Sequence, residues 1–115
     1  VFRFYDEGIA MAFADNLKQL PRISHLAALE LIDANDAVVA AIENKPGQAG
    51  SLAVYNHLAQ LYGAIGTEAA RKGLELYAEH VADARADPGK HPNIDRLIEL
   101  IESGGMLRVK QVFAL

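Results

Sequence analysis

The hydrophobic residues of this chain repeat with two different periods, one typical of helices and one typical of strands. Two apolar runs surround Asn35-Asp36 and predict a β-hairpin over 26–43, because these two residue types favour tight turns. Leu29 and Leu31 are two positions apart and therefore share one face of the hairpin. Their expected cross-strand counterparts are Val38, Ala40 and Ile42.

A second alternating pattern closes the chain and predicts a strand over 106–114. Leu107 and Val109 alternate with Arg108 and Lys110, which indicates a half-buried strand with basic side chains on its solvent face. Basic residues in this position also discourage unwanted pairing at a sheet edge.

Four further stretches have the period of a helix, and they cover about 13–20, 51–62, 67–86 and 93–103. Pro21, Gly63 and Gly104 mark helix ends. The expected N-caps are Ser51, Thr67 and Asn93. Gly73 lies inside the third helix, where glycine costs about 1 kcal/mol relative to alanine. Its presence indicates a close crossing of two helices.

The order of elements is helix, two strands, three helices and strand, which predicts an α+β fold. A small antiparallel sheet is expected, with helices covering one face. Residues 11–115 fit a single domain. Residues 1–10 are interpreted as an extension or a tag-derived segment, because Met11-Ala12-Phe13 resembles a native start. A three-stranded sheet has two open edges, and pairing between two copies would protect them, so a homodimer is expected.

Composition narrows the range of functions. The chain has no cysteine, which excludes disulfides and thiolate metal sites and fits a reducing cytoplasm. The net charge is −4, which argues against general binding of nucleic acid. No apolar run approaches the roughly 18 residues of a membrane span, so we expect no membrane partner.

The loop over 43–51 carries the most unusual local chemistry. Gly47 and Gly50 let backbone amides approach a ligand, Lys45 adds a positive charge, and Ser51 adds a hydroxyl at a helix start. These features suit a phosphate or a carboxylate. The loop lacks the glycine-lysine-serine ending of a nucleotide-binding P-loop. The simpler interpretation is a strand-to-helix turn capped by Ser51.

A second loop, residues 87–93, repeats the combination of Pro-Gly, a lysine and a following helix. Lys90, His91 and Asn93 are its candidate ligand-binding residues. If both loops meet at one end of the domain, Lys45 joins Lys90 and His91 around a single anion.

Histidines and carboxylates near the second loop suggest an alternative metal site. His80 and Asp83 lie one helical turn apart, and His91 follows as a possible third ligand. This spacing matches no established metal signature, and charged residues near a helix end most often form a solvated face. We predict no cofactor.

Four stretches together resemble a small bacterial family, domain of unknown function 2322. They are Glu43-Asn44-Lys45-Pro46-Gly47, Gly50-Ser51-Leu52-Ala53-Val54-Tyr55, Tyr77-Ala78-Glu79-His80 and Pro88-Gly89-Lys90-His91-Pro92-Asn93-Ile94-Asp95-Arg96. The resemblance covers Met11 to the C-terminus. It implies a bacterial, cytoplasmic protein, and it transfers no activity, cofactor or catalytic residue.

Two classes of function follow from the sequence. The favoured class is a non-enzymatic module that binds a protein partner or a small anionic ligand through the two Pro-Gly loops. The alternative is a small metal-assisted enzyme that uses His80, Asp83 and His91. An enzyme needs those side chains to converge in a pocket, whereas a binding module needs accessible loop amides and lysines.

Overall fold

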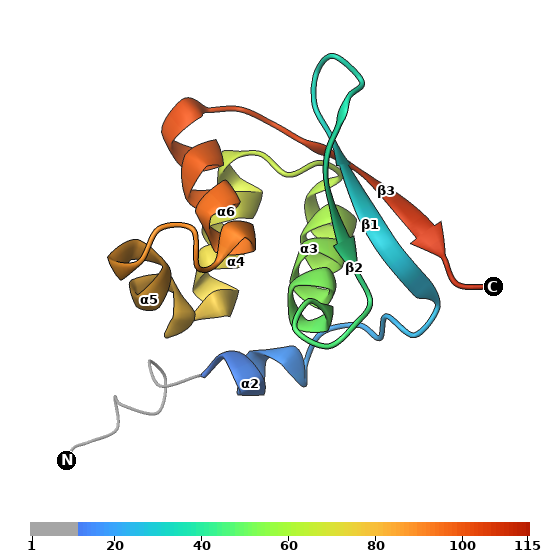
Figure 1. Ribbon diagram of the computed structural model, residues 1–115, viewed down its shortest axis with the longest axis horizontal. Coiled ribbons are helices and arrows are strands. Elements are labelled where there is room, and N and C mark those ends of the chain that lie inside the picture. Colours follow the sequence, from blue (N-terminus) through green and yellow to red (C-terminus); the bar gives the residue numbers. More distant parts are fainter. Residues whose placement is uncertain (1–11) are drawn as a thin grey trace.

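In the computed structural model, which describes residues 12–115, a three-stranded antiparallel sheet carries helices on one of its faces (Figure 1). The elements, with the labels of Figure 1, are α2 (Phe13–Leu17), β1 (Leu26–Ile32), β2 (Val38–Glu43), α3 (Ala49–Tyr62), α4 (Thr67–Tyr77), α5 (His80–Ala86), α6 (Pro92–Ser103) and β3 (Arg108–Phe113). The α+β prediction is confirmed. Residues 1–10, interpreted above as an extension or a tag-derived segment, lie outside the residues that the structure describes.

The sheet has the strand order β2-β1-β3, so the first strand of the hairpin is central. Leu29 pairs with Ile42 and Leu31 pairs with Ala40, as the alternation predicted. A register shift between Leu31 and Ile32 places Val38 opposite Ile32. Val38 is therefore exposed and does not join the buried face, which corrects its predicted place. The bulge arises beside a tight turn, and such irregularities are common there.

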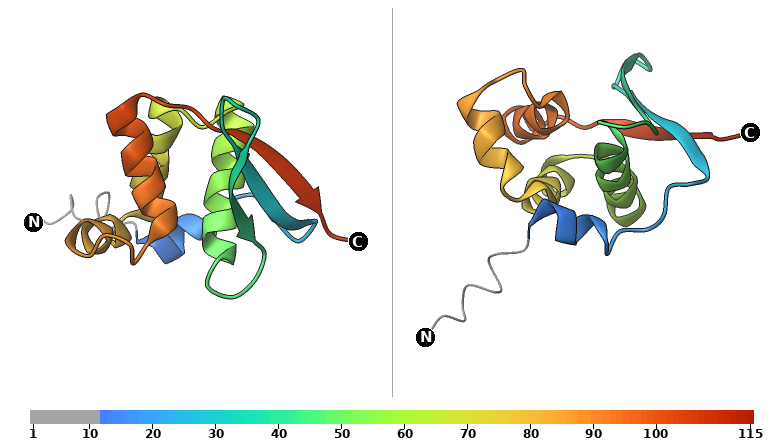
Figure 2. Two further views of the ribbon diagram at one scale, coloured as in Figure 1. Left: turned by 45° about the horizontal axis from the view of Figure 1, so that its top comes forward. Right: turned by 60° about the horizontal axis from the view of Figure 1, so that its bottom comes forward.

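Helix α3 lies directly on the sheet, and α4 and α6 pack behind it (Figure 2). Leu52, Tyr55 and Leu58 on α3 are fully buried, as are Leu29 and Leu31 on β1. The hydrophobic core therefore has two layers, one on each side of α3. Within residues 12–115, no helix combines the length and the apolar character that crossing a membrane requires.

Gly73 on α4 lies where α4 crosses both α3 and α6. A Cβ atom at Gly73 would lie 2.6 Å from Cδ1 of Leu97 and 2.9 Å from Cδ1 of Leu58. Both leucines are fully buried. The predicted close crossing is confirmed, and only glycine fits it without displacing a neighbour.

The predicted helix over 67–86 is wrong in one respect, because it is two helices separated at Ala78. Ala78 has φ 54° and ψ −120°, which ends α4 at Tyr77, and α5 then starts at His80. Two contacts on either side of the break come from α2. The ring of Phe13 stacks on Tyr77, and the Phe13 amide donates to the Glu79 carboxylate at 2.9 Å. These tertiary contacts favour the break over a continuous helix.

The predicted helix starts are also corrected. Helix α3 begins two residues earlier than expected, with Gln48 at the N-cap, so Ser51 lies inside the first turn. Helix α6 begins at Pro92 with His91 at the N-cap, because proline lacks the N–H that a first helical position leaves unused. Gly66 precedes α4, so Thr67 is not its cap. The remaining boundaries differ slightly, since α2 ends at Leu17 and β3 covers Arg108–Phe113.

Candidate functional site

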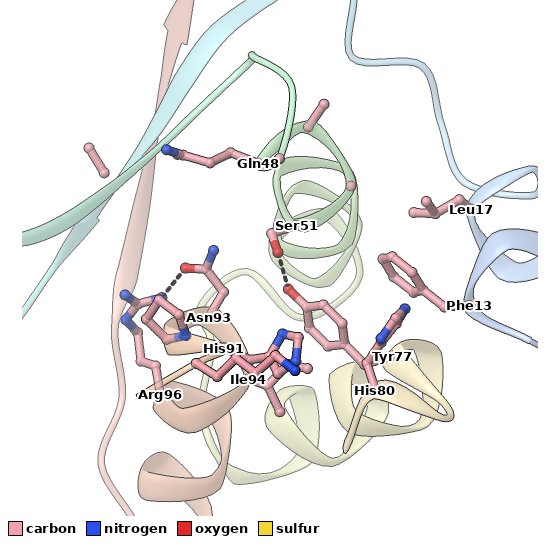
Figure 3. Close-up of a pocket in the computed structure, with 16 residues that line it drawn as sticks. Phe13, Leu17, Gln48, Ser51, Tyr77, His80, His91, Asn93, Ile94 and Arg96 are labelled. Atoms are coloured by element: carbon pink, nitrogen blue, oxygen red, sulfur yellow. Dashed lines mark hydrogen bonds between the residues drawn. The ribbon is translucent and has the colours of Figure 1, made fainter. Parts of the chain in front are cut away.

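A cavity of about 570 Å³ lies between the N-terminal ends of α3 and α6, with α2 and the α4–α5 junction along one side (Figure 3). Its lining within the described residues consists of Phe13, Leu17, Ala41, Gly47, Gln48, Ala49, Gly50, Ser51, Tyr77, His80, Lys90, His91, Pro92, Asn93, Ile94 and Arg96. The two Pro-Gly loops therefore meet at one cavity. The lining includes a lysine, an arginine and two histidines but no Asp or Glu, although the chain as a whole is acidic.

The first loop is held by its own backbone and by Gln48. The Lys45 carbonyl accepts from the amides of Gln48 and Ala49, at 3.0 and 2.9 Å. The Gln48 Oε1 atom accepts from the amide of Glu43 at 2.8 Å, across the turn. Gly47 has φ 88°, a conformation that favours glycine. This turn fixes the position of the first residues of α3, which line the cavity.

Gly50 lets α2 approach the first turn of α3. A Cβ atom at Gly50 would lie 3.2 Å from the ring of Phe13, tighter than an ordinary contact. The amides of Gly50 and Ser51 donate to no acceptor within residues 12–115. Ser51 accepts at Oγ from the Tyr77 hydroxyl at 2.6 Å, which leaves its own hydroxyl proton free to donate. Ser51 is therefore part of the cavity wall and not a helix cap.

The second loop is tied to α6 through Asp95, whose Oδ2 accepts from the Gly89 amide at 2.9 Å. Asn93 lies in the first turn of α6, and its backbone carbonyl accepts from the Tyr55 hydroxyl at 2.5 Å. The Asn93 side chain also accepts at Oδ1 from Nη1 of Arg96 at 2.8 Å. The predicted cap residue thus serves to orient an arginine.

Arg96 is the functional candidate that the sequence analysis missed. Its Nη1 donates to the Tyr55 hydroxyl at 3.1 Å, and its guanidinium carbon lies 5.7 Å from the centre of the Tyr55 ring. It forms no ion pair with any carboxylate among residues 12–115. The one available signal was its i, i+3 spacing from Asn93 on the same helix face.

Lys45 does not line the cavity. Its Nζ atom pairs with Glu43 Oε1 at 3.1 Å, outside the space between the helices. The structure therefore does not bring Lys45 into the cavity that Lys90 and His91 line. The other predicted ligand-binding residues, Gly47, Gly50, Ser51, Lys90, His91 and Asn93, all line the cavity.

Two of the three predicted metal-binding side chains, Asp83 and His91, lie in one polar cluster with Lys90. Asp83 Oδ2 lies 2.7 Å from His91 Nε2 and 3.1 Å from Lys90 Nζ. The hydrogen bond from His91 holds the pKa of the Asp83 carboxyl below its usual value, and Lys90 adds to the effect. His80 instead packs its ring edge-on against Phe13, with the ring centres 5.1 Å apart. Among residues 12–115, no group of three His, Cys, Asp or Glu side chains is arranged to hold a metal ion, so the geometry gives the metal hypothesis no support.

Two buried phenols form the inner wall of the site. Burial raises the pKa of Tyr55 from 10.0 to about 12, while the nearby Arg96 charge and hydrogen bond lower it by less. Burial likewise raises the pKa of Tyr77 well above its ordinary value, with Tyr55 adding to the effect. Both phenols therefore remain neutral hydrogen-bond donors at physiological pH.

We expect Tyr55→Phe to change the alkaline stability of the protein. An unfolded chain ionises tyrosine near pH 10, so the stability contributed by the raised pKa of Tyr55 is full below about pH 10 and is lost as the pH rises toward about 12. The variant lacks this loss, and its free energy of unfolding should fall less steeply above about pH 10. At neutral pH it should be about 1 kcal/mol less stable than wild type, because two hydrogen bonds are lost.

Urea titrations at several pH values from about 8 to about 11 measure this effect. Tyr62→Phe, which removes an exposed hydroxyl, is the matched control. Parallel profiles for Tyr55→Phe and wild type would contradict the raised pKa.

Comparison with known proteins identifies the family of the chain. A search of curated proteins and a search of solved structures each found no match. A family model for an uncharacterised protein conserved in bacteria, DUF2322, matches residues 13–111, which include all the residues that line the cavity. The match covers most of the chain, as the sequence resemblance implied, and the chain belongs to this bacterial family, domain of unknown function 2322.

Proposed function

We propose that this bacterial domain is a cytoplasmic, non-enzymatic binding module that holds a small anionic ligand in the cavity between α3 and α6. The observation that carries the proposal is Arg96, a half-buried cation at the cavity wall that has no carboxylate partner within residues 12–115. A guanidinium that is partly withdrawn from water favours an anion, because the loss of hydration weakens the stabilisation of its charge. The lining residues include no Asp or Glu that could satisfy it.

The helix N-termini beside the cavity also favour a negatively charged ligand. The first turns of α3 and α6 both face the cavity, and the amides of Gly50 and Ser51 are free of acceptors within residues 12–115. Unused amides and the partial positive charge of a helix N-terminus attract phosphate and carboxylate groups. The unused amides belong to α3. At α6, Pro92 has no N–H and the amides of Ile94 and Asp95 donate to the His91 carbonyl, so this helix contributes its partial positive charge.

Arg96→Gln is the variant that tests the proposal. We expect wild-type protein to bind at least one anion among inorganic phosphate, phenyl phosphate and benzoate at low ionic strength, where screening is weak. Arg96→Gln should weaken that binding by about 10- to 100-fold, because a hydrogen bond to a charged group is lost. Isothermal titration calorimetry measures the dissociation constants.

Two controls separate the site from general electrostatics. Arg71→Gln removes an equal charge from an exposed position on α4 that does not line the cavity, and Lys45→Ala removes the cation of the first loop. Both should bind with wild-type affinity. Equal weakening by Arg71→Gln, full affinity in Arg96→Gln, or no binding by wild type would overturn the proposal.

We also propose that two copies pair through the sheet. Strands β2 and β3 form its edges and have no strand beyond them within residues 12–115. Val38 and Val39 on β2 and Phe113 on β3 are large and exposed, so pairing with a second copy would cover apolar surface as well as an open edge. Light scattering should give twice the mass of the chain. A monomer mass at the highest attainable concentration would contradict this arrangement.

A further inference from the structure

The cavity between α3 and α6 has two chemically different ends. At one end, the rings of Phe13 and Tyr77 stack with their centres 5.3 Å apart and their planes at 17°. His80 meets Phe13 edge-on, and Leu17 adds an aliphatic side chain beside them (Figure 3). These side chains come from α2, α4 and α5, so three separate elements converge to build an aromatic wall.

The opposite end presents hydrogen-bond donors. Gln48 and Asn93 each have one amide oxygen already engaged, by the Glu43 amide and by Arg96 respectively. Their NH₂ groups have no acceptor within residues 12–115. In Figure 3 the Asn93 nitrogen points away from Arg96, toward the space below Gln48 and beside Ser51. The free NH₂ groups are donors that a ligand can use, so this end suits a group that accepts hydrogen bonds, such as a carboxylate or a phosphate.

Ser51 lies between the two ends, because its Oγ atom accepts from Tyr77 of the aromatic wall while its backbone belongs to the first turn of α3. Its free hydroxyl proton is a further donor at the junction. A ligand that uses both ends therefore passes Ser51.

We propose that the ligand is an organic anion in which a carboxylate or phosphate head is joined to an aromatic or similarly flat apolar body. The head lies among Arg96, Asn93 and Ser51, and the body lies against Phe13 and Tyr77. This inference rests on the proposed function and specifies the chemical class that the same cavity accepts.

Size and surface chemistry both favour such a ligand over a bare inorganic ion. The volume of about 570 Å³ falls within the range of about 300–1,000 Å³ that is typical of small-molecule pockets. An inorganic phosphate would occupy the donor end alone and leave uncovered the partly exposed side chains of the aromatic wall, which are Phe13, Leu17 and His80. A flat apolar body covers that exposed surface and adds ring contacts, which are worth about 0.5–1.5 kcal/mol each beyond the area they bury.

Matched pairs of probes test the inference by calorimetry. Phenyl phosphate is compared with methyl phosphate, and benzoate is compared with acetate, so that each pair shares a head and differs in the body. We expect the aromatic member of at least one pair to bind about tenfold tighter or more. The preferred pair shows whether the head is a phosphate or a carboxylate.

Two further measurements locate the body. In saturation-transfer NMR of wild-type protein, the ring protons of the bound aromatic probe farthest from the head should receive the strongest transfer. Phe13→Leu, which keeps an apolar side chain, should reduce the aromatic preference and leave the methyl phosphate and acetate affinities unchanged. If this variant fails to fold, the NMR result on wild type decides the question.

The outcomes separate this inference from the proposed function. Equal affinities within both pairs, with binding still dependent on Arg96, would overturn the inference that the ligand has an aromatic body and would leave the proposed anion site intact. Strongest transfer to protons beside the head would also overturn it. Absence of binding by every probe would overturn both.

Discussion

Leu97→Ala is expected to lower the free energy of unfolding by about 3 kcal/mol, and Gly73→Ala added to that variant is expected to recover part of the loss. Leu97 is fully buried on α6, where it packs against α4. Removing its side chain costs the transfer of the lost carbons and leaves a cavity that the surrounding helices fill only in part. The exposed Leu61→Ala on α3 is the control and should change stability by less than about 0.5 kcal/mol.

Gly73→Ala is expected to lower the free energy of unfolding of the wild-type protein and to raise that of the Leu97→Ala variant. In wild type the new methyl group would lie 2.6 Å from Cδ1 of Leu97 and 2.9 Å from Cδ1 of Leu58, an overpacking that costs about 1–3 kcal/mol. With Leu97 truncated, the closer of these contacts is gone and the methyl group partly fills the void. The double variant should therefore be at least about 1 kcal/mol more stable than the sum of the single changes.

Urea denaturation of the four proteins gives the coupling energy directly. Additive effects would mean that α4 and α6 are farther apart in solution than the distances at Gly73 require. Destabilisation by Leu61→Ala equal to that of Leu97→Ala would mean that the assignment of the core is wrong.

Gly73 also illustrates what local sequence can predict. A glycine inside a helical pattern costs stability, so its presence indicates a compensating contact, and the structure confirms a close crossing there. The hairpin and the C-terminal strand are confirmed for a similar reason, since alternation and turn residues are local signals. Each of these features depends on residues that are neighbours in the sequence.

Two of the errors arise where distant residues decide the local conformation. Neither neighbour of Ala78 is a glycine or a proline, so the sequence gives no local signal that the helix is interrupted there. The interruption is favoured by the contacts that α2 makes with Tyr77 and Glu79, on either side of Ala78. Ser51 has the residue type of a cap, but the Tyr77 hydroxyl engages it inside the first turn. Such contacts span 26 and 66 positions in the sequence, beyond any local pattern.

The candidate site likewise has some features that the local sequence predicts and others that depend on the fold. Both Pro-Gly loops were identified from their composition, because glycine, proline and a following helix are local features. Their convergence on one cavity depends on α3 and α6 both packing against α4, which no local pattern in the sequence predicts. Lys45 and Arg96 are both cations close to a loop, and the sequence offers no reason to choose the second. The choice depends on Glu43, which pairs with Lys45, and on Tyr55, which supports Arg96.

Ala78→Gly is expected to stabilise the protein by about 1 kcal/mol, although glycine usually weakens a helical region. At φ 54° and ψ −120° an alanine is strained, since its Cβ atom crowds the backbone, and such strain costs about 1–3 kcal/mol. Glycine removes the strain and adds about 0.5–1 kcal/mol of entropy loss on folding. The melting temperature should rise by about 4 °C.

Ala82→Gly provides the matched control, because Ala82 is an exposed residue inside α5 and its φ is not positive. There the substitution brings only the entropic cost, and the melting temperature should fall. Opposite signs for the two variants would establish that the break at Ala78 exists in solution. If both variants lose stability equally, α4 and α5 form one helix, as the sequence pattern suggested. Tyr77 and His80 would then be placed differently, and the aromatic wall that we assign to the ligand would not exist in its present form.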